Sequence, residues 1–248
     1  MADQVAIVTG ASRGIGFAVA QRFVAQGARV AITGRDADAL AAAVRELGGP
    51  DVALGIAGKG DDPAHRAAVI DAVGERFGPV TTLVNNIGIN PAYGPLATLD
   101  LNAARKMAEV NLIGTLGWVQ EALRGGLADA GGSIVNISSV SGVRPAPGIA
   151  FYGTTKAALI HLTEELAVEL APRVRVNAVA PAVVKTRFAT ALYEGREEQV
   201  AATYPLQRLG TTDDVAGAVA FLCSADAAWI TGQTIVIDGG VTLTGAVQ

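Results

Sequence analysis

Cysteine, histidine and aromatic residues are scarce in this sequence, and each shortage excludes a class of protein. The one cysteine, Cys223, leaves no partner for an internal disulfide, which is typical of a reducing compartment. Aromatic residues make up 5% of the chain, the net charge is −4 and no basic stripe is visible, so we expect no nucleic-acid partner. The two histidines belong to no cluster with metal-ligand spacing, so we expect no metal.

Long uncharged apolar runs are also missing. No such run reaches the ~18 residues that a helix needs to cross a bilayer. The first residues, MADQVAIVTG, lack the basic start and the cleavage site of a signal peptide. We therefore expect a soluble, cytoplasmic protein with no membrane partner. Cys223 itself lies in the apolar run VAGAVAFLCSA, where a small buried hydrophobe is a better interpretation than a reactive thiol.

What the chain does contain is an alternation of short apolar strands and longer helical segments. Half of its residues are hydrophobic, 17% are charged and 30 are glycine, which suits a sizeable core joined by tight turns. Apolar runs predict strands over residues 5–10, 29–34, 52–57, 82–86, 133–139, 175–181 and 234–240. Helical periodicity predicts helices over residues 15–27, 37–47, 62–77, 102–123, 150–171 and 212–224. This alternation indicates an α/β fold with one parallel sheet covered on both faces, and no linker divides residues 1–248 into two domains.

A glycine-rich turn, TGASRGIG at residues 9–16, joins the first predicted strand to the first predicted helix. Its spacing is Gly10-x-x-x-Gly14-x-Gly16. Glycine lets the backbone approach a phosphate closely, and the start of the helix directs free N–H groups at its charge. The turn therefore predicts a dinucleotide site, although a tight turn without a ligand can use the same glycines.

The residues after the second predicted strand distinguish NADP from NAD. Folds that prefer NAD place an acid there, which accepts a hydrogen bond from the ribose 2′-hydroxyl. This chain has Arg35 instead, and an arginine pairs with the 2′-phosphate that NADP carries and NAD lacks. Arg13, inside the glycine turn, can join it. We predict NADP(H), with NAD(H) left open because Asp36 follows one position later.

Several separated motifs resemble the short-chain dehydrogenase/reductase family in their order and spacing. They are TGASRGIG (9–16), NNIG (85–88), SIVNISS (133–139), YGTTK (152–156) and VNAVAPAVVKT (176–186). The resemblance extends from Val5 to about Gly240 and implies a single Rossmann-like domain with a seven-stranded parallel sheet. It also implies an oxidoreductase that transfers a hydride between a nicotinamide and a carbonyl or secondary alcohol. Many relatives of this length reduce 3-oxoacyl groups on acyl carrier protein.

The resemblance places the catalytic residues at Asn111, Ser139, Tyr152 and Lys156. Residues four apart on a helix share one face, so Tyr152 and Lys156 can point into one site. A nearby ammonium favours the charged form of a tyrosine, so we expect Lys156 to lower the pKa of Tyr152. Such a tyrosine can act as general acid or base on the carbonyl oxygen, which Ser139 can also hold by a hydrogen bond. The two threonines between the pair are interpreted as filler on the helix.

The resemblance also implies cofactor contacts along most of the chain. They are made by Gly10, Ser12, Arg13, Gly14, Ile15, Gly16, Arg35, Asn86, Gly88, Tyr152, Lys156, Pro181, Val184 and Thr186. It further implies that Asn111 anchors a water between Lys156 and solvent. The chain departs from the family at Ile87, Ala182, Lys59 and Thr81, of which the last two bear on adenine binding.

Residues 187–205, part of a substrate-covering region of about 187–210, are expected to line the pocket together with residues 142–151. Their apolar side chains suggest a partly apolar substrate; they are Phe151, Phe188, Leu192 and Tyr193. If the substrate is an acyl thioester on a carrier protein, the acidic carrier protein requires a basic docking patch near the site. The candidate residues for this patch are Arg144, Arg173 and Arg187. A free ketone, a sugar-derived carbonyl or a steroid-like carbonyl stays equally open.

Three further groups are interpreted as structural. His65 and His161 are surface or core filler, and the pair Asp213–Asp214 offsets the dipole at the start of a helix.

The alternative to an enzyme is a non-catalytic NADP(H)-binding regulator, which would have no need for the four candidate catalytic residues. The resemblance implies a homo-oligomer, most often a tetramer, with contacts through residues 229–240 and the helices near 102–123 and 152–171.

Overall fold

All seven predicted strands form in the computed structural model, which describes residues 4–244. The strands are β1 (Val5–Val8), β2 (Arg29–Gly34), β3 (Ala53–Ala57), β4 (Thr82–Asn85), β5 (Gly132–Ile137), β6 (Val174–Pro181) and β7 (Thr234–Ile237). They lie in the order β3-β2-β1-β4-β5-β6-β7, and every neighbouring pair is parallel. The predicted α/β fold with a seven-stranded parallel sheet is therefore confirmed.

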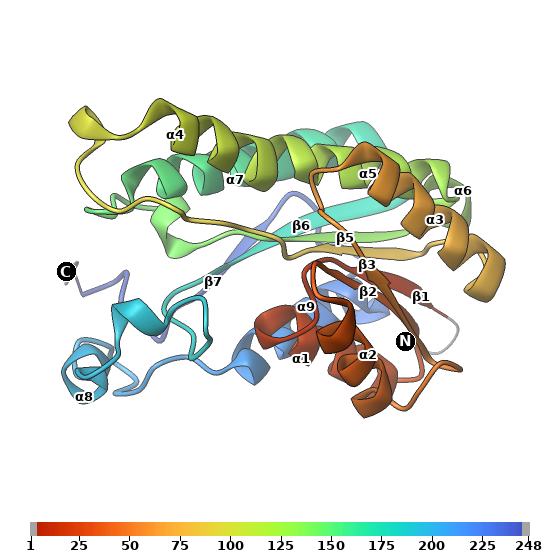
Figure 1. Cartoon of the computed structure of the whole chain (residues 1–248), viewed down its shortest axis with the longest axis horizontal. Coiled ribbons are helices and arrows are strands. Elements are labelled where there is room, and N and C mark those ends of the chain that lie inside the picture. Colours follow the sequence, from red (N-terminus) through yellow and green to blue (C-terminus); the bar gives the residue numbers. More distant parts are fainter. Residues whose placement is uncertain (1–3, 245–248) are drawn as a thin grey trace.

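Helices cover both faces of this sheet, as predicted (Figure 1). One layer holds α1 (Gly14–Ala25), α2 (Ala37–Glu46) and α9 (Thr212–Cys223). The other holds α3 (Pro63–Phe77), α4 (Leu101–Ala108), α5 (Gly114–Arg124) and α7 (Ala150–Leu170). Because successive strand residues face opposite sides, Ala6 and Val8 of β1 pack with the first layer, while Val5 and Ile7 pack with the second. The short helices α6 (Leu127–Ala130) and α8 (Glu197–Ala201) were not predicted.

The strand order reverses beside β1, and this reversal positions the candidate site. The chain passes from β1 to β2 and β3 on one side, then crosses over to β4 on the other. Loops that diverge at such a point leave a crevice at the carboxyl ends of the strands. Gly10, Asn86 and Ser139 follow β1, β4 and β5, so all three lie at this edge. The strands predicted over 5–10, 82–86, 133–139 and 234–240 extend too far because their last residues belong to these loops.

The helix predicted over residues 102–123 is interrupted near its middle. α4 ends at Ala108, a π-helical turn covers Glu109–Ile113, and α5 begins at Gly114. Single π turns inside helices frequently lie at functional sites. This one carries Asn111, whose side chain is completely buried.

Two residues that were expected near the site lie at the opposite edge of the sheet. Thr81 precedes β4, and its Oγ1 accepts from the N–H of Val5 at 3.0 Å and donates to the carbonyl of Val5 at 3.2 Å. Arg173 precedes β6 at the same edge. Because the carboxyl ends of parallel strands share the other edge, the expected influence of Thr81 on adenine binding is wrong. The placement of Arg173 in a docking patch near the site is wrong for the same reason.

Cys223 and Asp214 have the structural roles that the sequence indicates. Cys223 is buried in the first helical layer, and burial raises the pKa of its thiol to about 12. Asp214 forms a capping box with Thr211 at the start of α9 and pairs with Arg208. Within residues 4–244, no helix is both long enough and apolar enough to cross a membrane.

The two histidines lie away from the candidate catalytic residues. His65 is buried edge-on against Trp118, with their ring centroids 5.9 Å apart. His161 is exposed on α7 beside Glu164 and Glu165. One histidine is thus core filler and the other a surface residue.

Candidate active site

The glycine turn has a backbone that glycine adopts far more readily than other residues. Gly10 and Gly14 have φ values of +62° and +64°. A Cβ on Gly16 would lie 2.5 Å from Nδ2 of Asn86, so only glycine fits there. The turn opens onto the start of α1, where free backbone N–H groups favour an anion. Ile15 contributes backbone to this turn while its side chain packs against the core. These residues fit the phosphates of a dinucleotide.

Asn86 braces the turn from the end of β4. Its Nδ2 donates to the carbonyls of Thr9 at 2.9 Å and Gly10 at 3.0 Å. Its backbone N–H donates to Oγ1 of Thr9 at 3.0 Å. Both amide protons are engaged by the turn, so this side chain shapes the cradle. Thr9, directly after β1, accepts two of these bonds and so helps to hold the turn in place. Thr9 was not predicted from the sequence, although its position directly before Gly10 indicates such a role.

Ile87 fills the space between the glycine turn and the loop after β3. A Cβ on Gly10 would lie 3.0 Å from Cγ1 of Ile87, and a Cβ on Gly60 would lie 2.2 Å from its Cδ1. Two glycines therefore leave room for the large side chain of Ile87.

Arg13 lies in the glycine turn, and Arg35 directly follows β2. They follow Ser12 and Gly34, and a Cβ on Gly34 would lie 3.4 Å from Oγ of Ser12, so the two segments are adjacent. Both arginines are exposed, and neither forms an ion pair with a carboxylate of residues 4–244. Asp36 instead caps α2, accepting from the N–H of Ala39 at 3.0 Å. Two exposed arginines thus stand on adjacent segments, while Asp36, the acid next to Arg35 in sequence, is engaged as the cap of its own helix.

The segment after β6 returns to the glycine turn from the other side. Pro181 ends β6, and Val184 is buried and bridges to Gly210. A Cβ on Gly14 would lie 3.6 Å from Cγ2 of Thr186. The structure therefore brings Thr186 beside the turn, although it lies far away in sequence.

Ser139, Tyr152 and Lys156 meet where β5 ends and α7 begins. The hydroxyl of Tyr152 hydrogen-bonds with Ser139. Nζ of Lys156 lies 5.7 Å from the ring centroid of Tyr152 and donates to the carbonyl of Ile137 at 2.7 Å. Gly88 lies over this ammonium, because a Cβ there would be 3.3 Å from Nζ. Ser139, Tyr152 and Lys156, which are separated in sequence, therefore lie together in the structure.

The neighbouring serines have other partners. Oγ of Ser138 donates to the carbonyl of Lys156 at 3.0 Å. Ser141 donates to Oγ of Ser139 from both its hydroxyl, at 2.9 Å, and its backbone N–H, at 3.2 Å. Since Oγ of Ser139 accepts these two bonds, its own proton is the one that goes to the hydroxyl oxygen of Tyr152.

Burial controls the ionisation of the tyrosine–lysine pair. It raises the pKa of Tyr152, and the hydrogen bond with Ser139 lowers that pKa by less. It lowers the pKa of Lys156 to about 8. The expectation that Lys156 lowers the pKa of Tyr152 is therefore wrong for this structure, because desolvation of a phenolate is the larger effect. Tyr152 remains a protonated donor at neutral pH.

Asn111 links the π turn to two other segments. Its Oδ1 accepts from the N–H of Ile89 at 2.8 Å, and its Nδ2 donates to the carbonyl of Ile89 at 3.0 Å. The same Nδ2 donates to Oγ1 of Thr155 at 3.0 Å. Leaving such a buried donor without a partner costs about 1–3 kcal/mol. The interpretation of Thr155 as filler is therefore wrong, whereas Thr154 is exposed and donates to the carbonyl of Ala150 within its own helix.

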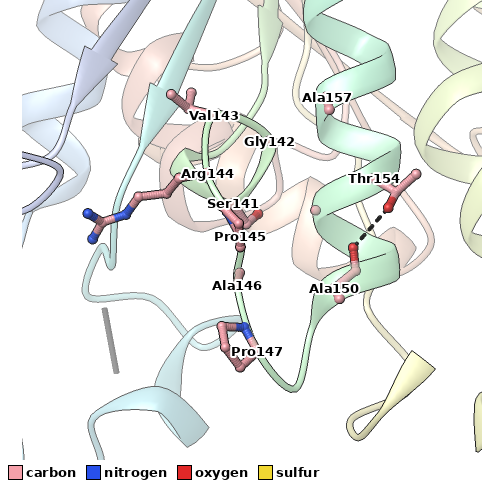
Figure 2. A pocket seen from close by; sticks show the side chains of 11 residues that line it. Ser141, Gly142, Val143, Arg144, Pro145, Ala146, Pro147, Ala150, Thr154 and Ala157 are labelled. Atoms are coloured by element: carbon pink, nitrogen blue, oxygen red, sulfur yellow. Dashed lines mark hydrogen bonds between the residues drawn. The ribbon is translucent and has the colours of Figure 1, made fainter. Parts of the chain in front are cut away.

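A cavity of about 500 Å³ lies between α7 and the loop that follows Ser139 (Figure 2). Residues 141–147 line one side, and Thr154 and Ala157 line the helix side. Neither Tyr152 nor Ser139 lines it. The cavity therefore lies beside the candidate site and not in it.

Two aromatic side chains lie beside Tyr152. The ring of Phe188 lies 6.2 Å from that of Tyr152, centroid to centroid, and Tyr93 is close enough to raise the pKa of Tyr152 further. Phe188 and Tyr93 are both more than half exposed. Tyr193, predicted to line the pocket, instead packs against a small core around Tyr204.

Comparison with known proteins finds relatives that match nearly the whole chain. A family model described as "Enoyl-(Acyl carrier protein) reductase" matches residues 10–242. The chain is 39% identical over 242 residues to "Tropinone reductase-like 3" of Erythroxylum coca, covering 96% of this chain and 92% of the relative. It is 36% identical over 251 residues to "Dehydrogenase/reductase SDR family member 4" of Homo sapiens, covering 97% and 88%.

Two solved structures agree closely with this one over their whole lengths. A short-chain dehydrogenase/reductase from Brucella melitensis, titled a glucose/ribitol dehydrogenase, superposes with a TM-score of 0.92 at 33% identity, covering 97% of each chain. A blue fluorescent protein from a metagenomic library, in complex with NADPH, has a TM-score of 0.88 at 34% identity, covering 97% of this chain and 98% of that one.

Proposed function

Because the chain belongs to the short-chain dehydrogenase/reductase family, we propose that it is an NADPH-dependent oxidoreductase acting on a carbonyl or secondary alcohol. The observation that carries this proposal is the meeting of Ser139, Tyr152 and Lys156 beside a glycine turn that fits a dinucleotide. NADPH, when bound, supplies the hydride. The chain supplies the positions and the proton.

Each of these residues has a distinct task in the reduction. Tyr152 donates its phenolic proton to the carbonyl oxygen, for which its raised pKa keeps the proton available. Ser139, whose proton goes to the hydroxyl of Tyr152 when no carbonyl is bound, donates that proton to the same carbonyl oxygen and stabilises the charge that develops there. The ammonium of Lys156 offsets the negative charge left on Tyr152. In the oxidation of an alcohol the proton moves the other way.

The ionisation of Lys156 predicts a pH dependence. Because the charged form is the useful one and its pKa is lowered to about 8, kcat/KM for NADPH should fall as the pH rises through about 8. Tyr152 does not cause this fall, since its pKa is raised and it stays protonated there. The measurement is initial rate against NADPH concentration from acidic to alkaline pH, because kcat/KM reports ionisations of the free protein. A profile that stays level well above pH 8 would contradict the role of Lys156.

Arg13 and Arg35 support the choice of NADP over NAD. Both are exposed and lie where adjacent segments meet, while Asp36 is engaged as the cap of α2. A 2′-phosphate would receive charge-assisted bonds from guanidinium groups there. The solved relative in complex with NADPH is consistent with this preference.

For the substrate, we propose a free and partly apolar ketone in preference to a thioester on a carrier protein. Phe188 and Tyr93 offer exposed aromatic surface beside Tyr152. Residues 187–210 would cover the substrate, and a small hydrophobic core that includes Tyr204 and Leu209 supports this segment. Arg173 lies at the far edge of the sheet, so of the three candidate arginines only Arg144 and Arg187 remain for a carrier protein. The relative named for tropinone reduction supports the same choice.

A screen for NADPH consumption tests the proposed function. The purified protein is mixed with NADPH and a panel of 3-oxoacyl thioesters, diketones and simple ketones, and the panel is repeated with NADH. We expect turnover with free ketones and NADPH. Tight NADPH binding without turnover on any member would favour the non-catalytic regulator instead.

We also propose a homotetramer in the cytoplasm. Trp229 is 100% exposed next to the edge strand β7, and Val168 of α7 is 82% exposed, so each would gain by burial against another copy. The buried, unpaired Cys223 suits a reducing compartment.

Substitution of the exposed tryptophan tests the assembly. Trp229→Arg places a charge where the proposed contact is apolar, so light scattering should show a smaller species than the wild-type tetramer. Leu206→Asp is the matched control, since Leu206 is exposed but belongs to the covering region. A monomeric wild-type protein would rule the tetramer out.

A further inference from the structure

Thr155 has a pair of hydrogen bonds that joins two elements of the candidate site. Its Oγ1 donates to the carbonyl of Tyr152 at 2.7 Å and accepts from Nδ2 of Asn111 at 3.0 Å. Thr155 is 3% exposed and Asn111 is 0% exposed, so both bonds are shielded from solvent. The hydroxyl therefore connects the π turn to the first turn of α7.

The donor and acceptor roles in this network have one consistent assignment. A threonine hydroxyl has one proton, and Thr155 uses it on Tyr152, so Asn111 must donate to Thr155. Turning the Asn111 amide over would place a second donor against the N–H of Ile89. Thr155 and Ile89 thus hold the amide in a single orientation.

Through Asn111, the network reaches the loop that covers Lys156. Ile89, bonded twice to Asn111, directly follows Gly88, and a Cβ on Gly88 would lie 3.3 Å from Nζ of Lys156. We propose that Thr155 is a positioning residue that holds Asn111 and, through it, the Gly88–Ile89 backbone in register with Tyr152 and Lys156. Its kinetic consequence rests on the proposed function; its structural consequence does not.

A merely local role is the alternative. Serine and threonine often bond back to a carbonyl three or four positions earlier in a helix. Thr154 does so to Ala150 at 3.1 Å, but it faces the cavity shown in Figure 2. Thr155 differs because its hydroxyl also accepts a hydrogen bond from Asn111, which lies in the π turn. Thr154→Val is therefore a matched control, which removes a back-bond from the same turn of α7.

The kinetic test compares three variants. Thr155→Val keeps the volume and removes both bonds, so kcat should fall about tenfold or more, while the Kd for NADPH, which also depends on the untouched glycine turn and arginines, should change by less. The fall in kcat/KM near pH 8 should also shift, because the surroundings of Lys156 change. Thr155→Ser restores both bonds and should recover most of kcat, and Thr154→Val should behave as wild type.

Hydrogen exchange at the amide of Ile89 tests the proposal without any turnover. Because this N–H donates to Asn111, Thr155→Val should speed its exchange about tenfold, with no change in Thr154→Val and recovery in Thr155→Ser. Unchanged Ile89 exchange in Thr155→Val would overturn the proposal, even if the variant melts at a lower temperature. If the wild type reduces no carbonyl, the proposed function fails, and the exchange result still decides the role of Thr155. Thr155→Ala replaces the valine variant if that variant does not fold.

Discussion

Replacement of Tyr152 by phenylalanine is expected to lower kcat for ketone reduction by about 10²–10⁴-fold, the usual contribution of a general acid. The substitution removes the phenolic proton and the hydrogen bond with Ser139, and leaves the ring in place. The Kd for NADPH should change far less than kcat, since the glycine turn and both arginines are untouched. Steady-state kinetics and a fluorescence titration with NADPH measure the two effects separately.

Tyr93→Phe is the matched control for this prediction. Tyr93 is exposed and close to Tyr152, but no step requires its proton. Its variant should retain most of the wild-type kcat. If Tyr152→Phe kept full turnover, another group would have to supply the proton. If the protein is a regulator that only binds NADPH, Tyr152→Phe should also leave its behaviour unchanged.

Arg35→Asp is expected to reverse or abolish the preference for NADPH. The change removes charge-assisted bonds to the 2′-phosphate and adds like-charge repulsion, so kcat/KM with NADPH should fall about 100-fold or more. An aspartate at this position can accept from the 2′-hydroxyl of NADH, so activity with NADH should be maintained or improved. The measurement is the ratio of kcat/KM for the two cofactors.

Two further variants separate this role from general surface charge. Arg13→Ala should weaken NADPH binding in the same direction and by less. Arg45→Ala, at the other end of α2 and also exposed, should leave both cofactors unaffected. If Arg35→Asp and Arg13→Ala both left the NADPH affinity unchanged, the assignment of NADP to this site would be wrong.

Local patterns predict most of the architecture, because each depends on neighbours in sequence. The apolar runs locate every strand, and Gly10, Gly14 and Gly16 mark the turn that only small residues can form. The spacing between Ser139 and Tyr152 selects the serine that hydrogen-bonds with the tyrosine. The ends of the strands are less predictable, since apolar character continues into loops that serve the site.

Features that arise from the packing of distant segments escape sequence reasoning. The π turn at Glu109–Ile113 and the bond from Asn111 to Thr155 depend on how α4, α5 and α7 meet. Burial also has the largest effect on the pKa of Tyr152, and burial cannot be inferred from the spacing between Tyr152 and Lys156 in the sequence. Arg173 fails as a candidate because sequence gives its charge but not the edge of the sheet on which it lies.

Transfer of deuterium most directly tests the central claim that this site moves a hydride to a carbonyl. The protein is incubated with NADPH deuterated at the transferable position of the nicotinamide and with the best ketone from the screen. Mass spectrometry of the product then locates the label. The proposed mechanism predicts an alcohol with one deuterium on the carbinol carbon, formed by the wild type and nearly absent with Tyr152→Phe. NADPH oxidation without deuterium in an alcohol product, or equal labelling by both proteins, would contradict it.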